Sequence, residues 1–518
     1  MNESICEERA ENGSSRFSVL AYLALAIMFS RALIVRTSGR GIFFGGEPYW
    51  IHWADQGYYW QSALALAHGN LAASQHLYPP LYSMLIAPFV WMGPALATML
   101  VDLGLYLACY TGFTSIARNF GIGHRPTLLI FICVTLLVPG VASSWSEPWT
   151  TTPSAALIFG SLALALSLNE SDTEHRRRRT DLALGALLGL IPCARPGDVV
   201  VSALIGLFIL WDLLVREREW VRLFTIIAGG ALALVPYALL YLAIWGLAPS
   251  RYARGSSTLF EFGRLGWKAY LLLVEPTPWY PDSHGLLKAL PWLVVSAAGA
   301  LVALIRGEER ERAALVLVPL AGYLVLMLAY VDLLPSGLWR FNNIHYFKWA
   351  ILLLALFAWK FFTGFRAAPL VSIGSLAVVL SATCLRFDPV SIGPNGPARM
   401  IVYRSTNVPF STVYFGNIAI RDLQGNQRNV LDIHAVPGTD GFIYVNSLRR
   451  EFQGHEIIAA SSLAGPTSST VDGATSARAY GPLVGRFAAK RGWGVPCWIP
   501  GYNALLRYGS LTTPSKCE

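Results

Sequence analysis

Long apolar stretches alternate with short charged or polar hinges from Arg16 to Leu385. A helix needs about 20 mostly apolar residues to cross the hydrocarbon core of a bilayer, which is roughly 30 Å thick. The alternation predicts about eleven transmembrane helices, of which the clearest lie near residues 17–35, 94–117, 126–138, 182–193, 223–245 and 369–385. The predicted fold class is therefore a mainly α polytopic membrane protein, with a transmembrane domain over residues 1–385.

Beyond residue 385 the pattern changes. Short apolar runs such as Thr412–Gly416 and Gly441–Asn446 are separated by Gly, Pro, Asn and Asp, which favour turns. We predict a small soluble C-terminal α/β or mostly β domain over residues 386–518. Cys497 and Cys517 lie in this segment and would form a disulfide only in an oxidising compartment.

Composition agrees with a membrane protein. Of the 518 residues, 54% are hydrophobic and only 14% are charged, which is too little charge for the surface of a large soluble protein. The net charge is +9, but much of it lies in short hinges between apolar stretches, where Lys and Arg set the orientation in the membrane. We therefore expect no nucleic-acid partner. The first apolar run is interpreted as a retained anchor, because no small-residue cleavage site follows it.

Basic residues cluster in alternate hinges. One set of hinges holds Arg118 and Arg125, Arg176–Arg179, Arg216, Arg218 and Arg222, Arg306, Arg310 and Arg312, and Lys360 and Arg366. Since cytoplasmic hinges carry an excess of Lys and Arg, we predict that this set is cytoplasmic. The protein would then be a multi-pass protein of the plasma (inner) membrane, with a cytoplasmic N-terminus and an extracytoplasmic C-terminal domain.

The polar interruption between the first two predicted helices is unusually aromatic. Residues 47–70 are rich in Trp, Tyr and His and include Asp55. Residues 57–68 carry aromatic and apolar groups at helical spacing, and a second apolar piece runs over residues 78–92. Both pieces predict helices that lie along the membrane surface with Trp and Tyr at the headgroups. We interpret this loop as the reaction centre.

Five charged residues fall in hinges that are predicted to face outward: Asp55, Glu147, Arg195, Lys268 and Arg340. Because these hinges open on one membrane surface, we expect their side chains to converge although they are far apart in sequence. A carboxylate near an acceptor hydroxyl can act as a general base, and cations can stabilise charge that develops on a leaving phosphate. Convergence would therefore create a site for transfer from a lipid-borne donor to a hydroxyl.

Each of these residues also has a structural interpretation. Asp55 is either the general base or a helix N-cap. Glu147 would orient the acceptor or hold a cation, or would be an ordinary interfacial acid. Arg195 would bind a lipid phosphate or extend to the lipid headgroups, and the same alternatives apply to Arg340. Lys268 is more often a solvated cation of a loop than a ligand.

Several short motifs follow one another along the chain in a characteristic order. They are Asp55 before Tyr58-Tyr59, Ala63-Leu-Ala-Leu-Ala-His-Gly69, Tyr78-Pro-Pro-Leu-Tyr82, Ser146-Glu147-Pro148 and Ala194-Arg195-Pro196-Gly197. In order and spacing they resemble the GT-C superfamily of integral-membrane glycosyltransferases, particularly the branch that contains protein O-mannosyltransferases and the lipid A aminoarabinose transferase. The resemblance covers about residues 17–385.

The resemblance implies an inverting transfer of a sugar from a polyprenyl-phosphate carrier at the extracytoplasmic face, to a hydroxyl of a glycolipid, polysaccharide or protein. Asp55 would be the general base, with Glu147 as a second catalytic candidate, and the donor phosphate would be held by Arg195, Arg340 and Lys268. The candidates for substrate binding are Tyr58, Tyr59, Tyr82, His345 and Tyr346. The expected partners are the donor lipid, the acceptor and membrane lipids.

No cofactor is expected to be required. Gln56 stands where many of these enzymes have a Glu, and the first loop has no Asp-X-Asp pair, which lowers the case for a divalent metal but leaves it open. Two alternatives to a single sugar transfer remain. A transporter or flippase for lipid-linked sugars would carry ionisable residues through the depth of the bundle, and a polysaccharide polymerase or ligase would give a ladder of products.

Overall fold

The structure is a computed structural model. It describes residues 2–364 apart from 38–53, 169–172, 306–308 and parts of 251–284 and 331–342, together with short segments between 391 and 512. The chain forms two compact units. One comprises Met1–Ser256, Ser296–Tyr323 and Ile344–Gly364, and the other comprises Ser257–Val295, Leu324–Asn343 and Phe365–Glu518. The predicted domain boundary at residue 385 falls outside the described residues.

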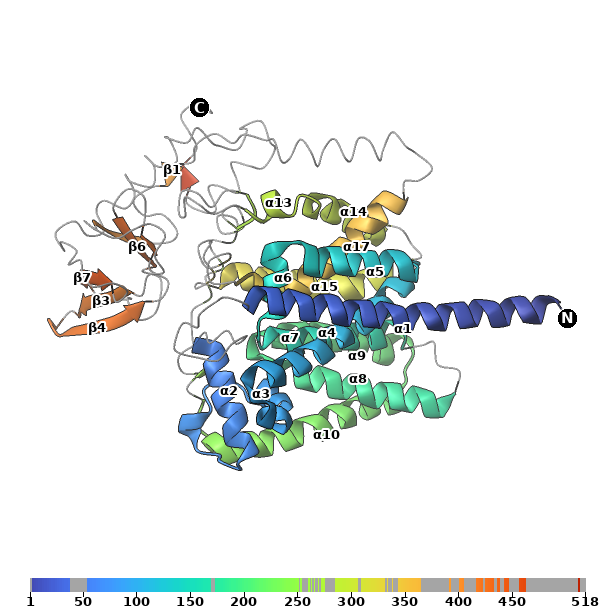
Figure 1. Ribbon diagram of the computed structural model, residues 1–518, viewed down its shortest axis with the longest axis horizontal. Helices are drawn as coiled ribbons and strands as arrows, with labels where there is room; N and C mark the ends of the chain where they lie inside the picture. Colours follow the sequence, from blue (N-terminus) through green and yellow to red (C-terminus); the bar gives the residue numbers. More distant parts are fainter. Residues whose placement is uncertain are drawn as a thin grey trace. The chain divides into compact units, whose positions relative to one another are not determined.

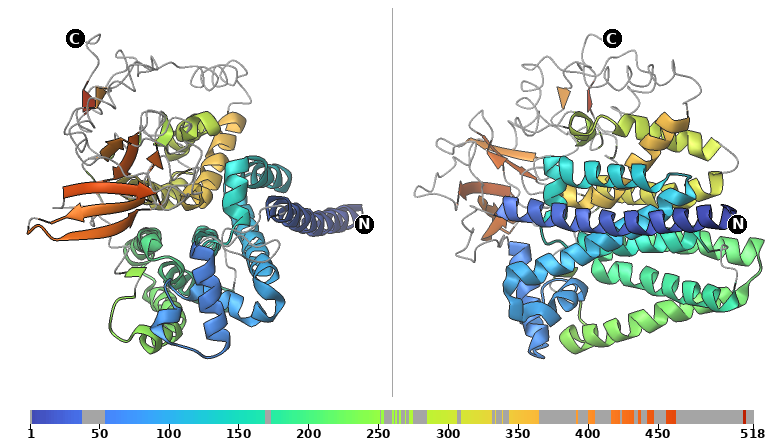
Figure 2. Two further views of the ribbon diagram at one scale, coloured as in Figure 1. Left: turned by 60° about the vertical axis from the view of Figure 1, so that its left-hand side comes forward. Right: turned by 45° about the vertical axis from the view of Figure 1, so that its right-hand side comes forward.

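The first unit is a bundle of helices (Figure 1). Its main helices are α1 (Asn2–Thr37), α4 (Gly93–Asn119), α5 (His124–Ile132), α6 (Pro139–Ser146), α7 (Thr151–Leu166), α8 (Glu174–Ala194), α9 (Val199–Trp211), α10 (Trp220–Trp245) and α17 (Lys348–Gly364), with parts of α14 (Leu293–Ile305) and α15 (Arg310–Ala329). Along the bundle α4 packs on α7, α7 on α8 and α8 on α10 (Figure 2).

Glycines set the close approach of α8 and α10. A Cβ atom added to Gly185 would lie 1.8 Å from the carbonyl oxygen of Ile226, and one added to Gly229 would lie 2.1 Å from the carbonyl oxygen of Leu182. The backbone of each helix therefore touches the other helix at a glycine, which carries no side chain. Such small-residue contacts are the usual means by which membrane helices pack closely, because no hydrophobic force draws helices together in lipid.

Six helical segments among the described residues are long and apolar enough to cross a membrane, and a bent pair makes a seventh. The six are Ser18–Val35, Leu81–Asn119, Pro196–Arg216, Trp220–Trp245, Arg310–Ala329 and Asn343–Thr363. On α10, Val221, Leu232 and Leu239 are 79%, 70% and 62% exposed, as expected of side chains that face lipid. The mainly α polytopic fold is confirmed, whereas the number of eleven stays a prediction because the span at 369–385 lies outside the described residues.

The hinge predicted to hold Glu147 is preceded by helical structure that the sequence did not predict. After α5 the chain makes a π-helical turn, η3 (Cys133–Leu137), and then forms α6, and the two helical pieces are bent by 93°. Pro139 begins α6, a position where its missing N–H costs no hydrogen bond, and Val138 before it is extended. The polar stretch therefore contains a helix that leads directly into Glu147.

The first loop of the bundle is helical, as predicted. It contains α2 (Ala54–Ala67), η1 (Ala73–Gln75), α3 (Leu81–Ile86) and η2 (Ala87–Met92). The hydroxyl of Ser62 on α2 hydrogen-bonds to Nδ1 of His76 at 2.8 Å, and the hydroxyl of Ser83 on α3 donates to the carbonyl oxygen of Tyr59 at 3.0 Å. These bonds hold α2 against α3 and against the segment that precedes α3, and so help to fix the helix that carries Asp55.

The predicted basic hinges meet at one end of the bundle. Arg312 on α15 donates to the carbonyl oxygen of Asn119 at 3.0 Å. Lys360 near the end of α17 donates to the carbonyl oxygen of Phe120 at 3.0 Å and to Glu309 at 2.6 Å. The end of α4, the start of α15 and the end of α17 therefore lie together, and which side of the membrane they face stays a prediction.

The second unit contains α13 (Leu286–Ala289) and short antiparallel strands. The strands are β1 (Ser391–Ile392), β2 (Met400–Arg404), β3 (Gly416–Arg421), β4 (Gln427–Asp432), β5 (Val436–Pro437), β6 (Phe442–Asn446), β7 (Glu456–Ser462) and β8 (Leu511–Thr512). They form sheets of order β2-β6-β5 and β4-β3-β7 and a β1-β8 pair. That residues 386–518 form one α/β domain stays a prediction, and Cys497 and Cys517 lie outside the described residues.

Candidate active site

Asp55 lies in the first turn of α2, where the helix dipole favours a negative charge. It is the second residue of the helix and not the residue before it, so it does not occupy the N-cap position of the alternative interpretation. Its Oδ1 atom accepts a hydrogen bond of 2.5 Å from the phenol of Tyr78. This length lies at the short end of the range for a hydroxyl bound to a carboxylate, so the bond is a strong one.

Aromatic rings surround this pair. The Tyr78 ring lies 4.9 Å from the ring of Tyr59 and 4.9 Å from that of Tyr252. Burial, and then the nearby Asp55 carboxylate, raises the pKa of both Tyr59 and Tyr78. Both phenols therefore remain protonated, and that of Tyr78 donates to Asp55. Tyr58 on α2 is 41% exposed, more than Tyr59, Tyr78 or Tyr252.

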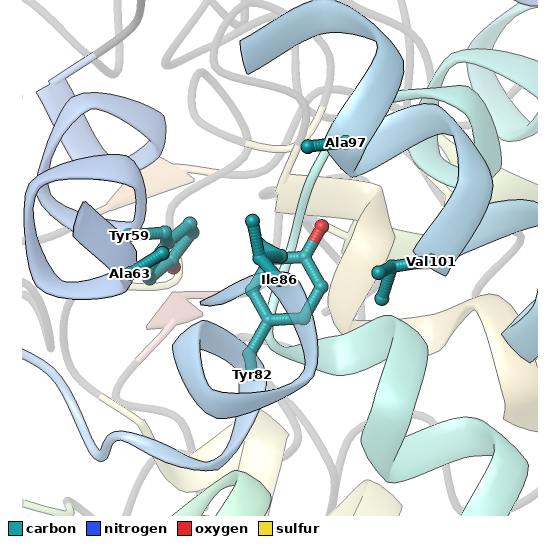
Figure 3. Close-up of a cluster of buried hydrophobic side chains, with 6 residues drawn as sticks. All are labelled: Tyr59, Ala63, Tyr82, Ile86, Ala97 and Val101. Atoms are coloured by element: carbon teal, nitrogen blue, oxygen red, sulfur yellow. The ribbon is translucent and has the colours of Figure 1, made fainter. Parts of the chain in front are cut away.

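Tyr82 packs against the aromatic group. Figure 3 shows Tyr82 and Ile86 of α3 between Tyr59 of α2 and Val101 of α4. The Tyr82 side chain is fully buried, and its phenol donates to Oδ1 of Asp102 on α4 at 2.8 Å. Tyr82 thus connects α2 to the interior of the bundle.

The turn that carries Glu147 is joined to the start of α2. Gln56, the residue after Asp55, donates from Nε2 to the carbonyl oxygen of Pro148 at 3.0 Å. Glu147 is 6% exposed, and its Oε2 atom accepts a hydrogen bond of 3.2 Å from Nε1 of Trp149. The two acids predicted to share a site are therefore carried by segments in direct contact.

His345 completes this side of the site. Its ring stacks on Trp149 with centroids 4.0 Å apart and planes 10° from parallel. Its Nδ1 atom lies 3.1 Å from the hydroxyl of Thr151, and the tautomer of the ring decides which of the two donates. The segment before α17 is thereby held against the Glu147 turn.

Arg195 lies in the turn between α8 and α9. It is 9% exposed, so its side chain is buried in the protein instead of extending to lipid headgroups. Its Nη1 atom donates to Oδ1 of Asp198 at 3.2 Å and to the phenol oxygen of Tyr323 at 2.9 Å. The guanidinium carbon stands 4.2 Å from the ring centroid of Tyr346, a cation–π geometry.

The contacts join Asp55, Glu147 and Arg195 into one group. Tyr252 packs on Tyr78, and both Tyr252 and Tyr346 interact electrostatically with Tyr59 and Arg195. We call this group the polar cluster; it comprises Asp55, Tyr58, Tyr59, Tyr78, Glu147, Trp149, Arg195, Tyr252, His345 and Tyr346. It offers carboxylates, phenols, a buried guanidinium and stacked aromatic rings within one region. Lys268 and Arg340 lie outside the described residues.

Several residues that position the side chains of the site were not candidates from the sequence. Tyr78 begins the Tyr78–Tyr82 motif but was not a site candidate, although a phenol close to an acid indicates a hydrogen bond between them. Lys348 was not among the candidates. Asp198 was not a candidate either, although it accepts from both Arg195 and Ser154. Asp102 gave the clearest signal, since it is an acid inside a predicted membrane helix.

A metal site is a separate question. In the part of the chain that the structure describes, no group of three or more His, Cys, Asp and Glu side chains is arranged to hold a metal ion. The expectation that no cofactor is required, with a divalent metal left open, stays a prediction.

Comparisons with known proteins come from solved structures. No family model and no curated protein matches the sequence. Two crystal structures of ArnT from Cupriavidus metallidurans are similar to the chain. The apo form is 16% identical with a TM-score of 0.46, and the form bound to undecaprenyl phosphate is 17% identical with a TM-score of 0.45. Each match covers 71% of this chain and 64% of the ArnT chain, so the match spans less than two thirds of ArnT. At these scores the likeness transfers no residue role to this chain.

Proposed function

We propose that the protein is an integral-membrane glycosyltransferase that moves a sugar from a polyprenyl-phosphate donor to a hydroxyl acceptor with inversion at the anomeric carbon. The observation that carries the proposal is the position of Asp55. It is a carboxylate in a helix's first turn, hydrogen-bonded to a phenol and joined through Gln56 to the turn of a second acid. The motif resemblance supports the same reaction.

In this reaction Asp55 takes the proton of the acceptor hydroxyl as its oxygen attacks the anomeric carbon. A new carbon–oxygen bond forms on one face of the sugar while the bond to the phosphate oxygen breaks on the other. The bonding electrons leave with the phosphate, so the products are an inverted glycoside and a polyprenyl phosphate. The Tyr78 phenol orients the carboxylate, because its raised pKa keeps it a donor to Asp55.

The leaving phosphate needs a cation. Arg195 is the described candidate of the sequence prediction, and its guanidinium is already oriented by Asp198, Tyr323 and Tyr346. A guanidinium has five N–H donors in a rigid fork and suits phosphate oxygens. In the proposal Arg195 acts with Arg340 and Lys268, and the exposed Tyr58 ring packs on the sugar.

The test is transfer by purified protein in nanodiscs, supplied with polyprenyl-phosphate sugars and a mixture of glycolipid, glycan and peptide acceptors. We expect a new glycoside whose anomeric configuration, measured by NMR, is opposite to that of the donor. The same preparation carrying Asp55→Asn is the control and should give none. Retention of configuration would overturn the mechanism, and movement of the lipid-linked sugar across the bilayer with no glycosidic bond formed would favour the flippase. A ladder of products would favour a polymerase.

A further inference from the structure

Lys348, the first residue of α17, is fully buried. A charged amine is costly to remove from water unless hydrogen bonds and opposite charges compensate. Its Nζ atom donates to the hydroxyl of Thr152 at 2.6 Å and to the carbonyl oxygen of Ser144 at 3.2 Å. It also lies 5.0 Å from the ring centroid of Trp145. These three contacts are therefore all with residues of one short segment.

The two acceptors stand on opposite sides of Glu147. Ser144 is in α6 and Thr152 is in α7, so the amine joins the two helices across the segment 144–152, which we call the Glu147 turn. A second connection lies nearby. His345, just before Lys348 in sequence, stacks on Trp149 and bonds to Thr151 in the same turn. The start of α17 therefore contacts the Glu147 turn at Trp149 and at four further residues, which are Ser144, Trp145, Thr151 and Thr152.

Acidic side chains balance the charge of Lys348. The amine interacts electrostatically with Asp102 and Glu147. Asp102 accepts a hydrogen bond from Tyr82 through Oδ1, while its buried Oδ2 atom has no hydrogen-bond partner among the described residues. Because Tyr82 packs on Tyr59, the arrangement reaches from the Glu147 turn to the aromatic side of the polar cluster.

We propose that Lys348 is a positioning residue for sugar transfer, which fixes the Glu147 turn so that the Glu147 carboxylate and the Trp149–His345 pair keep their places beside Asp55. The catalytic part of this inference rests on the proposed function. The conformational part does not, since it concerns only what holds the turn. Lys348 itself touches no reacting atom in this assignment.

The experiment compares Lys348→Met with Lys360→Met. Both lysines lie on α17, and each donates to one backbone carbonyl and one side-chain oxygen, but Lys360 does so at the opposite end of the helix. Two quantities are measured for each variant: hydrogen exchange of the amides of residues 144–152 by mass spectrometry, and kcat and KM for transfer. Binding of undecaprenyl phosphate is measured separately. The double variant Lys348→Met with Asp102→Asn serves if the single variant does not fold, because it leaves no unpaired buried charge.

We expect faster exchange in residues 144–152 for Lys348→Met alone, a fall in kcat of about a hundredfold, and unchanged affinity for undecaprenyl phosphate. Lys348→Arg should recover part of the rate, because it keeps the charge and the donors. Unchanged exchange would overturn the inference whatever the activity. Faster exchange with an unchanged kcat would overturn the positioning role. If the unsubstituted protein transfers no sugar while exchange still responds to Lys348→Met, the proposed function fails and the structural role of Lys348 stands.

Discussion

Acidic side chains at the two ends of the helical bundle have different partners. At the end that holds the basic hinges, Asp181 and Glu219 bind Arg222, Asp212 and Glu311 bind Arg216, and Glu309 binds Lys360. Toward the polar cluster, Asp55 accepts from Tyr78, Asp102 from Tyr82, Glu147 from Trp149, and Asp198 from Ser154 as well as from Arg195.

The difference in hydrogen-bond partners indicates a different role for the acids at each end. A carboxylate that is paired with a cation is stabilised in its charged form and becomes a weaker base. A neutral phenol or indole orients a carboxylate without adding a full opposing charge. Ion pairs at one end hold helices together. At the other end neutral donors orient Asp55 and Glu147, while Asp198 is still paired with Arg195.

The most direct test of this difference is to remove one acid from each end of the bundle. Asp55→Asn should lower kcat by about 10²–10⁴-fold, the range expected for loss of a general base. Asp212→Asn is the matched control, since it removes an acid that binds Arg216 near the other end. Its kcat should not change. Equal kcat values for the two variants, measured in the same membrane preparation, would show that the ends do not differ in this way.

Arg222→Met should have the largest effect on stability. Arg222 is 7% exposed, and its Nε and Nη2 atoms bind both carboxylate oxygens of Asp181 at 3.1 Å. Loss of one partner leaves a buried charge unpaired, which costs about 3–5 kcal/mol. Unfolding in detergent should show this loss, while kcat of the folded protein stays the same. The double variant with Asp181→Asn should recover most of the stability, and no recovery would contradict the reasoning.

Tyr78→Phe should have a smaller effect on the reaction. The variant keeps the ring contacts and loses the hydrogen bond to Asp55, so we expect kcat to fall about tenfold, equivalent to about 1.4 kcal/mol. The raised pKa of Tyr78 means that its phenol stays protonated over the assay range. The ratio of the two rates should therefore be constant between about pH 6 and pH 9. A ratio that changes across this range would mean that the phenol titrates.

Arg216→Gln should have the smallest effect. Its ion pair with Glu311 is 2.8 Å long, but the two side chains are 50% and 66% exposed. Exposed pairs contribute little because water and salt screen them. Neither the melting temperature nor kcat should change measurably, and a large loss of either would show that the exposed pairs do more than orient the helices.

Much of the fold was predictable from the sequence. The predicted apolar stretches matched α4, α8 and α10, since hydrophobic length is a local property of the chain. The helix at α2 followed from the spacing of its aromatic residues. The predicted hinge that holds Glu147 did not include α6, because this short run of small and polar residues has little apolar periodicity and its start is set by Val138-Pro139.

The sequence by itself indicated that the chain spans a membrane and that its basic hinges share one end, and it predicted that Asp55, Glu147 and Arg195 belong to one site. Only the tertiary structure decided which groups hold these side chains. Tyr78 and Asp55 are 23 positions apart, and Lys348 and Ser144 are 204 apart. No local pattern encodes such pairs, because a hydrogen bond forms between whichever donor and acceptor the packing of the helices brings within reach.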